Sequence, residues 1–592
     1  MIRRSLMMLS VSCISAAVAL TPVRCRAAMP APFPAPLAAH VPGDALIYFG
    51  WSGPVAKWPE YKTSNLHIVL SHTDIAKFIQ GNLPIMLNRL DAIPKFHNIP
   101  QLKVHLEQTV AIGALFMTHP FAIYFRPIST GIRHVAPLPQ VVLIMKAEKS
   151  ASAVEAIFKK IPSPLYPGGP RVRTGTVGSI VYVGIHLTPG VTRALAGRDA
   201  ALWKSEKFDN TMRLLNFSPN RPVLAEFADL SRMRKYLNEL LDVAVRNAGK
   251  RNTHVGIRRR HFIGAAKSIL KVQSIRNATA FAAADGFSGA QWLEAAFLAM
   301  RHGAAAPTTG AADMLALAPK KSPDVSVSDV NLGHVVGTLE KIIEAASPQG
   351  RYHVEQAITM LNGITGVDVR KDIIDALGSY WLTYQSPEMP MTSALGEVVV
   401  NRLAHPKRMA LSLQTLAPMA LLAVNAAMRQ HGYKGPPAQL KILHSHGAVI
   451  YYLKATGIMP AYAIAHGKLY FSAYPRPIQR ALARPVGAPS ILDNKKFIAL
   501  QKLLGGPTSY TSAAFIDEPR LLSGSYNTIT TQVATYSLLL GLQLDPPISS
   551  IIPRLSDLQK ATTTSGRVTW TDAAGWHSRS ISGYPGSGLF VP

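Results

Sequence analysis

An internal repeat is the feature of this sequence that most constrains its fold. Lys207-Phe208 recurs as Lys496-Phe497 at an offset of 289 residues, and residues 179–183 resemble residues 468–472 at the same offset. Further matches at or near this spacing are Arg193-Ala-Leu195 with Arg480-Ala-Leu482, Leu215 with Leu504, Asp229 with Asp517, Phe281 with Trp570, Gly286 with Gly575 and Phe287 with Trp576. A run of matches at nearly constant spacing predicts a tandem duplication.

Matches further upstream have a smaller offset. Residues 121–125 resemble residues 380–384, and residues 141–143 resemble residues 398–400, at an offset near 257. The difference between the two offsets predicts about 30 extra residues in the second copy. We expect these extra residues within 403–466.

Both copies have the same expected order of elements. A strand pair precedes a helix, which covers 150–161 in the first copy and 406–430 in the second. Strands and helices mixed without a strict βαβ rhythm predict an α+β fold of two tandem related halves, with mixed, largely antiparallel sheets and packed helices. The expected halves are 43–303 and 324–592, and segment 304–323, which contains Ala, Thr, Gly and Pro, is the expected linker.

Three segments resemble a known group of proteins. They are VPGDALIY at 41–48, DVRKDIIDALGSYW at 368–381, and the Lys-Phe segment before each strand that ends in Asp. In these segments the chain resembles a family of large exported bacterial proteins of uncharacterised function, which open with a short Pro-small-Asp-Ala strand after a signal peptide. The resemblance covers most of the chain as a pattern of apolar spacing, and the chain departs from it in its basic composition. It implies an envelope location and no particular activity.

The first 27 residues have the pattern of a signal peptide. Arg3 and Arg4 precede a mostly apolar stretch at 6–20, and small residues lead to an expected cleavage site after Ala27. The apolar stretch is shorter than a membrane span of about 20 residues, and an uncleaved anchor is the alternative. The Pro-rich segment 28–42 is expected to be an extended tether. The expected location is therefore the periplasm or the outside of the cell.

Cleavage would remove both cysteines of the chain, Cys13 and Cys25. The mature chain would then form no disulfide and no thiolate metal site. Four arginines also leave with the signal peptide, so 58 Lys and Arg would face 33 Asp and Glu, a net charge of +25. The most apolar later segment, 411–428, contains Pro418 and Asn425 and is expected to be a buried helix. We therefore expect no transmembrane span in the mature chain.

The sequence lacks the local motifs of common catalytic and cofactor sites. Ser268 and Lys271 have Ser-x-x-Lys spacing, but the chain has no Lys-Thr-Gly or Ser-Asp-Asn partner for them. His444 and His446 would share one strand face, but no third metal ligand follows closely. Phosphate-binding loops and His-Glu-x-x-His are absent as well. We therefore expect no catalytic residues, no metal and no cofactor.

The strongest anomaly of charge is a basic segment at 246–276. It contains no acid and nine cationic residues, which are Arg246, Lys250, Arg251, Arg258, Arg259, Arg260, Lys267, Lys271 and Arg276. Such a segment attracts phosphates, sulfated glycans or anionic lipid head groups. Only Phe262 is available to stack on a base, which argues against nucleic acid. The predicted anion-binding residues are Arg251, Arg258, Arg259, Arg260, Lys267 and Lys271, and the alternative is a solvated helix after a basic loop.

The basic balance also has a compositional interpretation. In an acidic exterior, carboxylates that must ionise in the native state lose their stabilising interactions when they are protonated. A chain poor in Asp and Glu avoids that loss, so the charge would be an adaptation to the surroundings. This hypothesis predicts similar unfolding midpoints at acid and neutral pH.

Together these patterns favour an exported, non-catalytic binding or structural protein of the bacterial cell envelope. Its expected partner is an anionic envelope polymer or lipid head groups, contacted through segment 246–276. The alternative is an envelope hydrolase with dispersed catalytic residues, which a perturbed carboxylate near a histidine would favour. A further alternative is an assembly subunit that binds its partner through an exposed sheet face.

Overall fold

The computed structural model describes most of the chain after residue 32. The predicted signal peptide at 1–27 lies outside the described residues, as does most of the basic segment. The described residues are 33–71, 73–74, 112–113, 115–116, 118–128, 137–161, 170–217, 221–248, 263–302, 310–388, 396–455, 459–505, 510–539 and 552–585.

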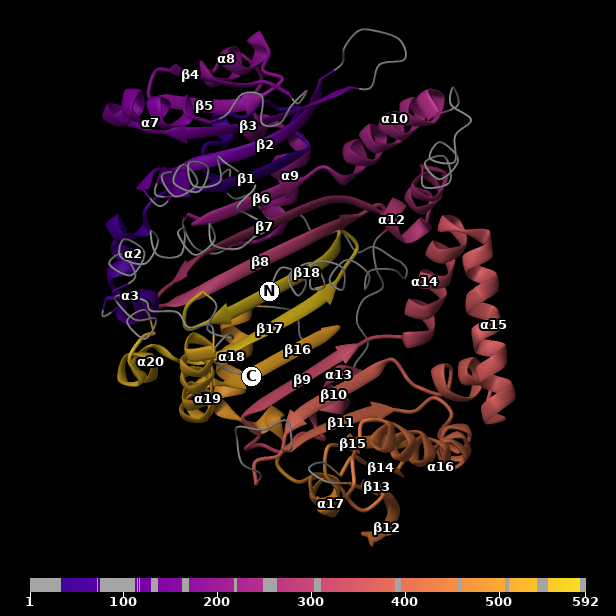
Figure 1. The fold of residues 1–592 in the computed structure, drawn as a ribbon. Coiled ribbons are helices and arrows are strands. Elements are labelled where there is room, and N and C mark those ends of the chain that lie inside the picture. The colour runs from indigo at the N-terminus through magenta and orange to yellow at the C-terminus, as the bar shows by residue number, and fades with distance from the viewer. Residues whose placement is uncertain are drawn as a thin grey trace.

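One antiparallel sheet of 18 strands runs through the molecule (Figure 1). This sheet, with helices packed against it, confirms the predicted α+β fold and its antiparallel strands. The strands of the N-terminal part are β1 (Ile47–Trp51), β2 (Phe121–Ile128), β3 (Leu138–Lys146), β4 (Val172–Val177), β5 (Ile180–Ile185), β6 (Leu224–Ala228), β7 (Ala278–Ser288) and β8 (Gln291–Met300). Those of the C-terminal part are β9 (Asp324–Asp329), β10 (Tyr380–Gln385), β11 (Glu397–Arg402), β12 (Gln439–Ser445), β13 (Ala448–Lys454), β14 (Ala461–Ala465), β15 (Lys468–Ser472), β16 (Ser512–Asp517), β17 (Thr564–Thr571) and β18 (Gly575–Ser582).

Helices occupy most of the chain between these strands. In the N-terminal part they are α2 (Pro59–Lys62), α3 (Asn65–Leu70), α7 (Ala151–Phe158), α8 (Pro189–Leu195), α9 (Glu206–Leu214), α10 (Leu230–Ala248) and α12 (Gln273–Asn277). In the C-terminal part they are α13 (Gly310–Leu315), α14 (Leu332–Ala346), α15 (Pro348–Thr365), α16 (Pro406–Gln430), α17 (Pro475–Ala483), α18 (Lys495–Leu504), α19 (Glu518–Leu539) and α20 (Leu555–Ala561).

The pairings along the sheet place its strands in a nearly symmetric order. The N-terminal strands follow β4-β5-β3-β2-β1-β6-β7-β8 from one edge to the centre. Leaving out β12 and β13, the C-terminal strands follow β14-β15-β11-β10-β9-β16-β17-β18, which is the same order of corresponding strands. The two parts meet where β8 pairs with β18. The duplication stays a prediction, and this shared strand order favours it.

Most of the sequence matches lie in corresponding strands. Segment 121–125 lies in β2 and its match 380–384 in β10, while 141–143 lies in β3 and 398–400 in β11. Two matches do not correspond: Gly286 and Phe287 lie in β7, whereas Gly575 and Trp576 lie in β18. The reason is that β17 ends at Thr571, which at the offset of 289 residues matches Ala282, whereas β7 continues to Ser288, so the second hairpin turns earlier.

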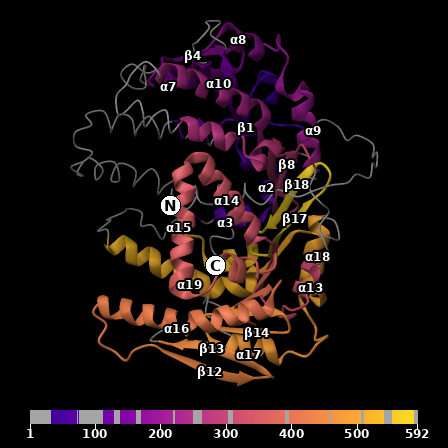
Figure 2. The ribbon, with the colours of Figure 1, turned by 90° about the vertical axis from the view of Figure 1, so that its right-hand side faces the viewer.

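Corresponding helices cover corresponding parts of the sheet. The N-terminal and C-terminal parts each bury a hydrophobic cluster, which we call the first and the second core. Phe208 and Met212 of α9 are buried in the first core, and Phe497 and Leu500 of α18 are buried in the second. Figure 2 shows α9, α13 and α18 along one side of the sheet. The short helix α7 buries Phe158 against Val181 and Val183 of β5. Alternate residues of a strand point to opposite faces, and Ile180 and Tyr182 of β5 pack on the α9 side, so α7 covers the other face of the sheet.

The described parts of the expected tether and linker belong to these cores. In the tether, Phe33 packs on Phe217, and Ala38 and Val41 are buried. In the linker, residues 310–323 include helix α13, whose Met314 and Leu315 are buried in the second core. Both segments therefore pack as parts of the fold from residues 33 and 310 onward.

Helix α16 departs from its expected burial. Its bounds agree with the predicted helix at 406–430, but only 11% of its apolar window is buried. Met409 and Ser412 are its buried residues, whereas Leu411 and Leu422 are exposed. The expectation of a buried helix was wrong, because apolar composition alone does not supply a surface to pack against. Among the described residues, α16 is also the one helix long and apolar enough, by length and composition, to cross a membrane.

A buried arginine joins the two parts of the sheet at its centre. Arg579 in β18 is 8% exposed, and its Nη1 donates to the Leu504 carbonyl at 3.0 Å. Its Nη2 donates to the Leu215 carbonyl at 3.3 Å and also to the Asn216 carbonyl. Leu504 ends α18 and Leu215 follows α9, so one guanidinium satisfies carbonyls at the C-terminal ends of two corresponding helices.

Replacing this arginine should destabilise the whole sheet. Arg579→Met leaves the carbonyls at both helix ends without their donor, so we expect the free energy of unfolding to fall by about 2–4 kcal/mol. Urea denaturation followed by circular dichroism measures the change. Arg567→Met removes an exposed arginine from the neighbouring strand β17 and should change stability by less than about 0.5 kcal/mol. Equal losses in the two variants would contradict the role of Arg579.

Candidate functional site

Each half of the molecule builds a lysine–aspartate ion pair at the start of a helix. Lys207 Nζ lies 2.5 Å from Asp229 Oδ1, and Lys496 Nζ lies 2.8 Å from both carboxylate oxygens of Asp517. The lysines stand in the first turns of α9 and α18, and the aspartates follow or end β6 and β16. Both carboxylates are buried, and a buried charge is costly unless it is paired and hydrogen-bonded. The sequence matches at these four residues therefore coincide with the same ion pair in the N-terminal and C-terminal parts.

The same backbone frame surrounds both ion pairs. The Asp229 amide donates to the Leu46 carbonyl at 2.7 Å, and the Asp517 amide donates to the Pro323 carbonyl at 2.7 Å. An isolated bridge joins Pro42 to Ala201 in the first half and Pro319 to Ser490 in the second. These contacts bring the chain before the first strand of each half against the entrance of α9 or α18. An open groove forms there in each half.

The groove of the first half has mixed charge. Its volume is about 500 Å³, and its charged lining is Asp44, Arg126, Asp199, Lys204 and Arg232. Arg126 Nη1 lies 3.0 Å from Asp44 Oδ1, and Arg232 donates to the Asp44 carbonyl at 2.9 Å. Two of its three cations are thus held by Asp44. We call it the mixed groove.

The groove of the second half is strongly basic. Its volume is about 300 Å³, and its charged lining is Lys320, Lys321, Lys495, Lys496, Asp517 and Arg520. Five cationic and one anionic side chain give a net charge of +4, and the one carboxylate is already bound to Lys496. Lys320, Lys321 and Lys495 are exposed, and none has an ion-pair partner within the described part of the chain. We call it the basic groove.

Corresponding positions explain this difference in charge. Gly43 and Lys320 each follow a bridge residue, and their amides donate to the carbonyls of Ala200 and Pro489, so the two positions correspond. Lys321 then corresponds to Asp44. Lys495 replaces Glu206 as the first residue of its helix. The ion pair and the following arginine, Arg232 or Arg520, stay the same in kind. The groove of the C-terminal part thus has the same backbone frame as the groove of the N-terminal part, but its lining is basic instead of mixed.

The basic groove has the chemistry of an anion site. Three lysines and an arginine offer donors with full positive charge, and the positive end of α18 lies beside them. Asn494 caps α18 by accepting from the Lys496 amide at 2.9 Å, so the side chains rather than the helix amides are free to bind an anion. Sequence reasoning missed these residues because Lys320-Lys321 and Lys495-Lys496 are far apart in the chain. The lysine pairs themselves were the available signal.

The predicted anion-binding segment is only partly described. Arg251, Arg258, Arg259 and Arg260 lie outside the described residues. Lys267 Nζ forms an ion pair with Asp242 of α10 and donates a hydrogen bond to its carboxylate. This hydrogen bond lowers the pKa of Asp242. Lys271 is exposed and has no ion-pair partner in the ranges described. The structure therefore leaves Lys271 available to an anion and binds Lys267 to an acid just outside the segment.

A cluster of three carboxylates lies on one face of the central sheet. Asp285 of β7 pairs directly with Glu294 of β8, and Glu226 of β6 lies diagonally across. Burial, helped by the charges of Glu294 and Glu226, raises the pKa of Asp285 to about 7. Burial also raises the pKa of Glu226. Ser580 Oγ, from the other half, donates to Glu294 at 2.7 Å, so the cluster lies at the junction of the two halves.

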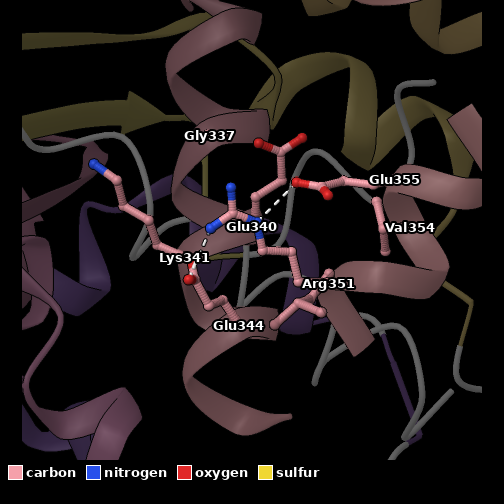
Figure 3. A pocket seen from close by; sticks show the side chains of 8 residues that line it. Gly337, Glu340, Lys341, Glu344, Arg351, Val354 and Glu355 are labelled. Atoms are coloured by element: carbon pink, nitrogen blue, oxygen red, sulfur yellow. Dashed lines mark hydrogen bonds and ion pairs between the residues drawn. The ribbon is translucent and has the colours of Figure 1, made fainter. Parts of the chain in front are cut away.

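A further cavity, of about 190 Å³, lies between α14 and α15 (Figure 3). Arg351 crosses it and donates to Glu344 at 2.7 Å and to Glu355 at 2.8 Å. Hydrogen bonds to these two carboxylates raise the pKa of Arg351. The ion pair with Glu344 joins the two helices, the pair with Glu355 lies within α15, and together they leave no unpaired guanidinium for a ligand. The cavity is therefore a structural joint.

His444 and His446 are the two histidines that the sequence predicts on one strand face, without a third metal ligand. Both histidines are exposed, and His446 stands in the turn after β12 with a φ of 47°. No group of three His, Cys, Asp or Glu residues that could hold a metal ion occurs in the described ranges. The expected shared strand face does not form, because β12 ends at Ser445.

Comparisons with known proteins were made for the whole chain. No family model matches it, no curated protein matches it, and no solved structure matches it. The resemblance of segment 41–48 to exported proteins therefore stays a prediction, and the function has to be argued from the geometry of the grooves.

The carboxylate cluster predicts a pH-dependent stability. The pKa of Asp285 in the folded protein, about 7, is above its ordinary value of 3.8, so the folded state keeps a proton that the unfolded chain releases between these values. Its contribution is fully present below about pH 4 and is lost as the pH rises through about 7. Asp285→Asn cannot ionise and should exceed the wild type in free energy of unfolding at pH 8 by roughly 2–4 kcal/mol, and match it at pH 4. Urea unfolding at both pH values measures this.

The control for this pH effect is an exposed aspartate. Asp313→Asn removes a carboxylate that is exposed on α13 and should leave the pH dependence of stability unchanged. Asp324, whose pKa burial and then the charge of Glu397 raise to about 6, should contribute in the same direction as Asp285. The account is contradicted if the free energy of unfolding changes between pH 4 and pH 8 by the same amount in the wild type, in Asp285→Asn and in Asp313→Asn.

Proposed function

We propose that this protein is an exported, non-catalytic binding protein of the bacterial cell envelope, and that it contacts an anionic polymer through the basic groove. The observation that carries the proposal is the set Lys320, Lys321 and Lys495, three unpaired cations around a groove whose carboxylate is already neutralised. Acidic groups of a polymer would find several charged donors there at once.

The mixed groove supports this interpretation by contrast. The two grooves have the same backbone frame, which carries Gly43, Asp44 and Glu206 in the N-terminal part and three lysines in the C-terminal part. The lysines are therefore not required by the fold. Clustered like charges repel one another, so their presence at three corresponding positions favours an anionic ligand that binds there.

Export rests on the N-terminal sequence pattern. The Arg pair, the apolar stretch at 6–20 and the small residues before Ala27 are the support for it. Sulfated or carboxylated polymers are typical partners for a basic protein in the periplasm or outside the cell. Segment 246–276, with Arg258, Arg259 and Arg260, is a second contact that such a polymer would use.

An envelope hydrolase is a second candidate, and one observation favours it. Asp285, with its pKa near 7, would be protonated at mildly acidic pH and able to donate a proton, as a general acid does. Within the described part of the chain, however, no histidine hydrogen-bonds to Asp285, Glu294 or Glu226. A small pocket with a nucleophile beside Asp285 would be needed for hydrolysis, and the described cavities lie elsewhere.

Binding to a sulfated polysaccharide tests the proposal. Replacing Lys320, Lys321 and Lys495 together by Ser should weaken binding of heparin about tenfold or more at low salt and reduce its salt dependence, because three screened charge contacts are lost. Isothermal titration at several salt concentrations measures both quantities. Circular dichroism checks that the variant keeps its fold. We expect no loss of structure, because these three lysines are exposed and form no ion pair among the described residues.

Two further variants make the result specific. Lys62, Lys149 and Lys235 are exposed lysines outside the basic groove, and their replacement by Ser matches the change in net charge. This control should bind within about twofold of the wild type. Replacing Arg258, Arg259 and Arg260 by Ser tests the predicted segment separately. If only that variant loses binding, the contact lies in the segment and not in the groove, and if all variants bind equally, the binding proposal fails.

A further inference from the structure

The second half carries a projecting arm that the first half lacks. We define the arm as residues 406–454, which contain α16 and the hairpin β12–β13. Helix α7 of the first half has 8 residues where α16 has 25. From the end of α7 to β4 there are 13 residues, but from the end of α16 to β14 there are 30. The extra residues expected within 403–466 thus lie in the arm, which Figure 2 shows beside α17 at the lower end of the molecule.

Contacts with the helical segment Val369–Ile374 and with the sheet hold α16 along its length. Ser412 Oγ donates to the Asp372 carbonyl at 3.3 Å, and the Tyr462 hydroxyl donates to the Leu413 carbonyl at 3.4 Å. Near its C-terminal end, Asn425 exchanges two hydrogen bonds with Ala438, at 2.7 and 3.1 Å. The helix is therefore fixed on the sheet by one side, while β11 and β12 hold both of its ends in that sheet.

The other side of α16 is apolar and uncovered. Leu411 is 66% exposed and Leu422 is 70% exposed. Thr415, Pro418 and Ala426 continue this exposed stripe at helical spacing. Cations flank it at both ends: Lys407 and Arg408 in the first turn, and Arg429 in the last. An apolar face with cationic ends and no acid is typical of helices that lie in a membrane interface.

The outer end of the arm combines exposed apolar and cationic side chains. Ile442 of β12 is 56% exposed, and Lys441, which is also exposed, precedes it on the opposite face of the strand. Arg429, Lys434 and Lys454 are exposed as well, and Lys454 pairs with Gln439 at the start of β12. None of these four cations has an ion-pair partner among the residues that the structure describes. We call Leu422, Arg429, Lys434, Lys441, Ile442 and Lys454 the arm tip.

Charge along the chain sets this region apart from the rest. No Asp or Glu occurs from residue 398 to residue 492, a stretch of 95 residues in which the chain average would place about five. The same stretch contains 11 Lys and Arg residues. The arm therefore has no acid of its own to repel an anionic surface or to neutralise its cations.

We propose that the arm docks on an anionic lipid bilayer, with the apolar side chains of the arm tip entering the head-group region and its cations contacting lipid phosphates. Charge complementarity commits the proposal to this occupant: the arm carries exposed Leu and Ile together with cations that have no ion-pair partner among the described residues, and a bilayer of anionic lipids offers both partners at once. The helix lies on the surface and does not span it, because its contacts with the sheet hold it by one side. This surface is separate from the basic groove, so the two proposals stand or fall independently.

Vesicle flotation with the full chain tests the arm. Vesicles of phosphatidylcholine and phosphatidylglycerol in equal parts should bind the protein at least tenfold more tightly than phosphatidylcholine alone. Replacing Leu422 and Ile442 by Ser should lower this binding at least tenfold and leave heparin binding unchanged. Replacing Arg429, Lys434 and Lys441 by Ser should lower it similarly and reduce its dependence on phosphatidylglycerol.

The matched control comes from α15. Met360 and Ile364 are 66% and 60% exposed, and their replacement by Ser removes exposed apolar side chains that lie outside residues 406–454. That variant should bind vesicles within twofold of the wild type. Equal vesicle binding by the wild type and both arm variants would overturn the proposal. Dimerisation without lipid that is lost in the Leu422 and Ile442 variant would overturn it too, because the occupant would then be a second copy of the chain.

Discussion

The guanidinium of Arg579 binds the ends of two helices that belong to opposite halves of the sheet. It has no carboxylate partner in the described structure, and its charge is met by carbonyl groups of Leu504, Leu215 and Asn216. Burial lowers the pKa of Arg579, which shows the desolvation that these carbonyls must offset. One side chain thus anchors the C-terminal ends of both α9 and α18, and the opposite ends of the two helices begin beside Asp229 and Asp517.

Those opposite ends carry the two grooves. Lys207 and Lys496 stand in the first turns of α9 and α18 and bind the buried Asp229 and Asp517. The ion pairs, the bridges and the backbone hydrogen bonds around them are the same in both halves, whereas the exposed lining is not. The frame therefore serves stability and the lining is free to serve binding, which is why charge differs at corresponding positions while structure does not.

The sequence predicted the helix and strand types of the fold well where the signal was local. Helix α16 has the bounds expected from its apolar run, and the matched segments at 121–125 and 380–384 lie in corresponding strands. Prediction failed where burial or pairing depends on distant residues. Lys267 is one of the predicted anion-binding residues, and only the structure shows that Asp242 on the preceding helix forms an ion pair with it. The apolar run of α16 suggested a core helix, yet no element covers its outer side in the described structure.

The sequence by itself determined the antiparallel α+β class, the order of elements, the repeated Lys-Phe and Asp positions, and the excess of cations. These depend on periodicity and composition, which are properties of neighbouring residues. Only the tertiary structure decided which cations remain unpaired and where they gather. The basic groove unites Lys320-Lys321 with Lys495-Lys496, and Arg579 joins helices that are far apart in the chain. Electrostatic and hydrogen-bond partners depend on the distance between atoms in space. For residues far apart in the chain this distance is set by the folded sheet and cannot be read from their spacing in the sequence.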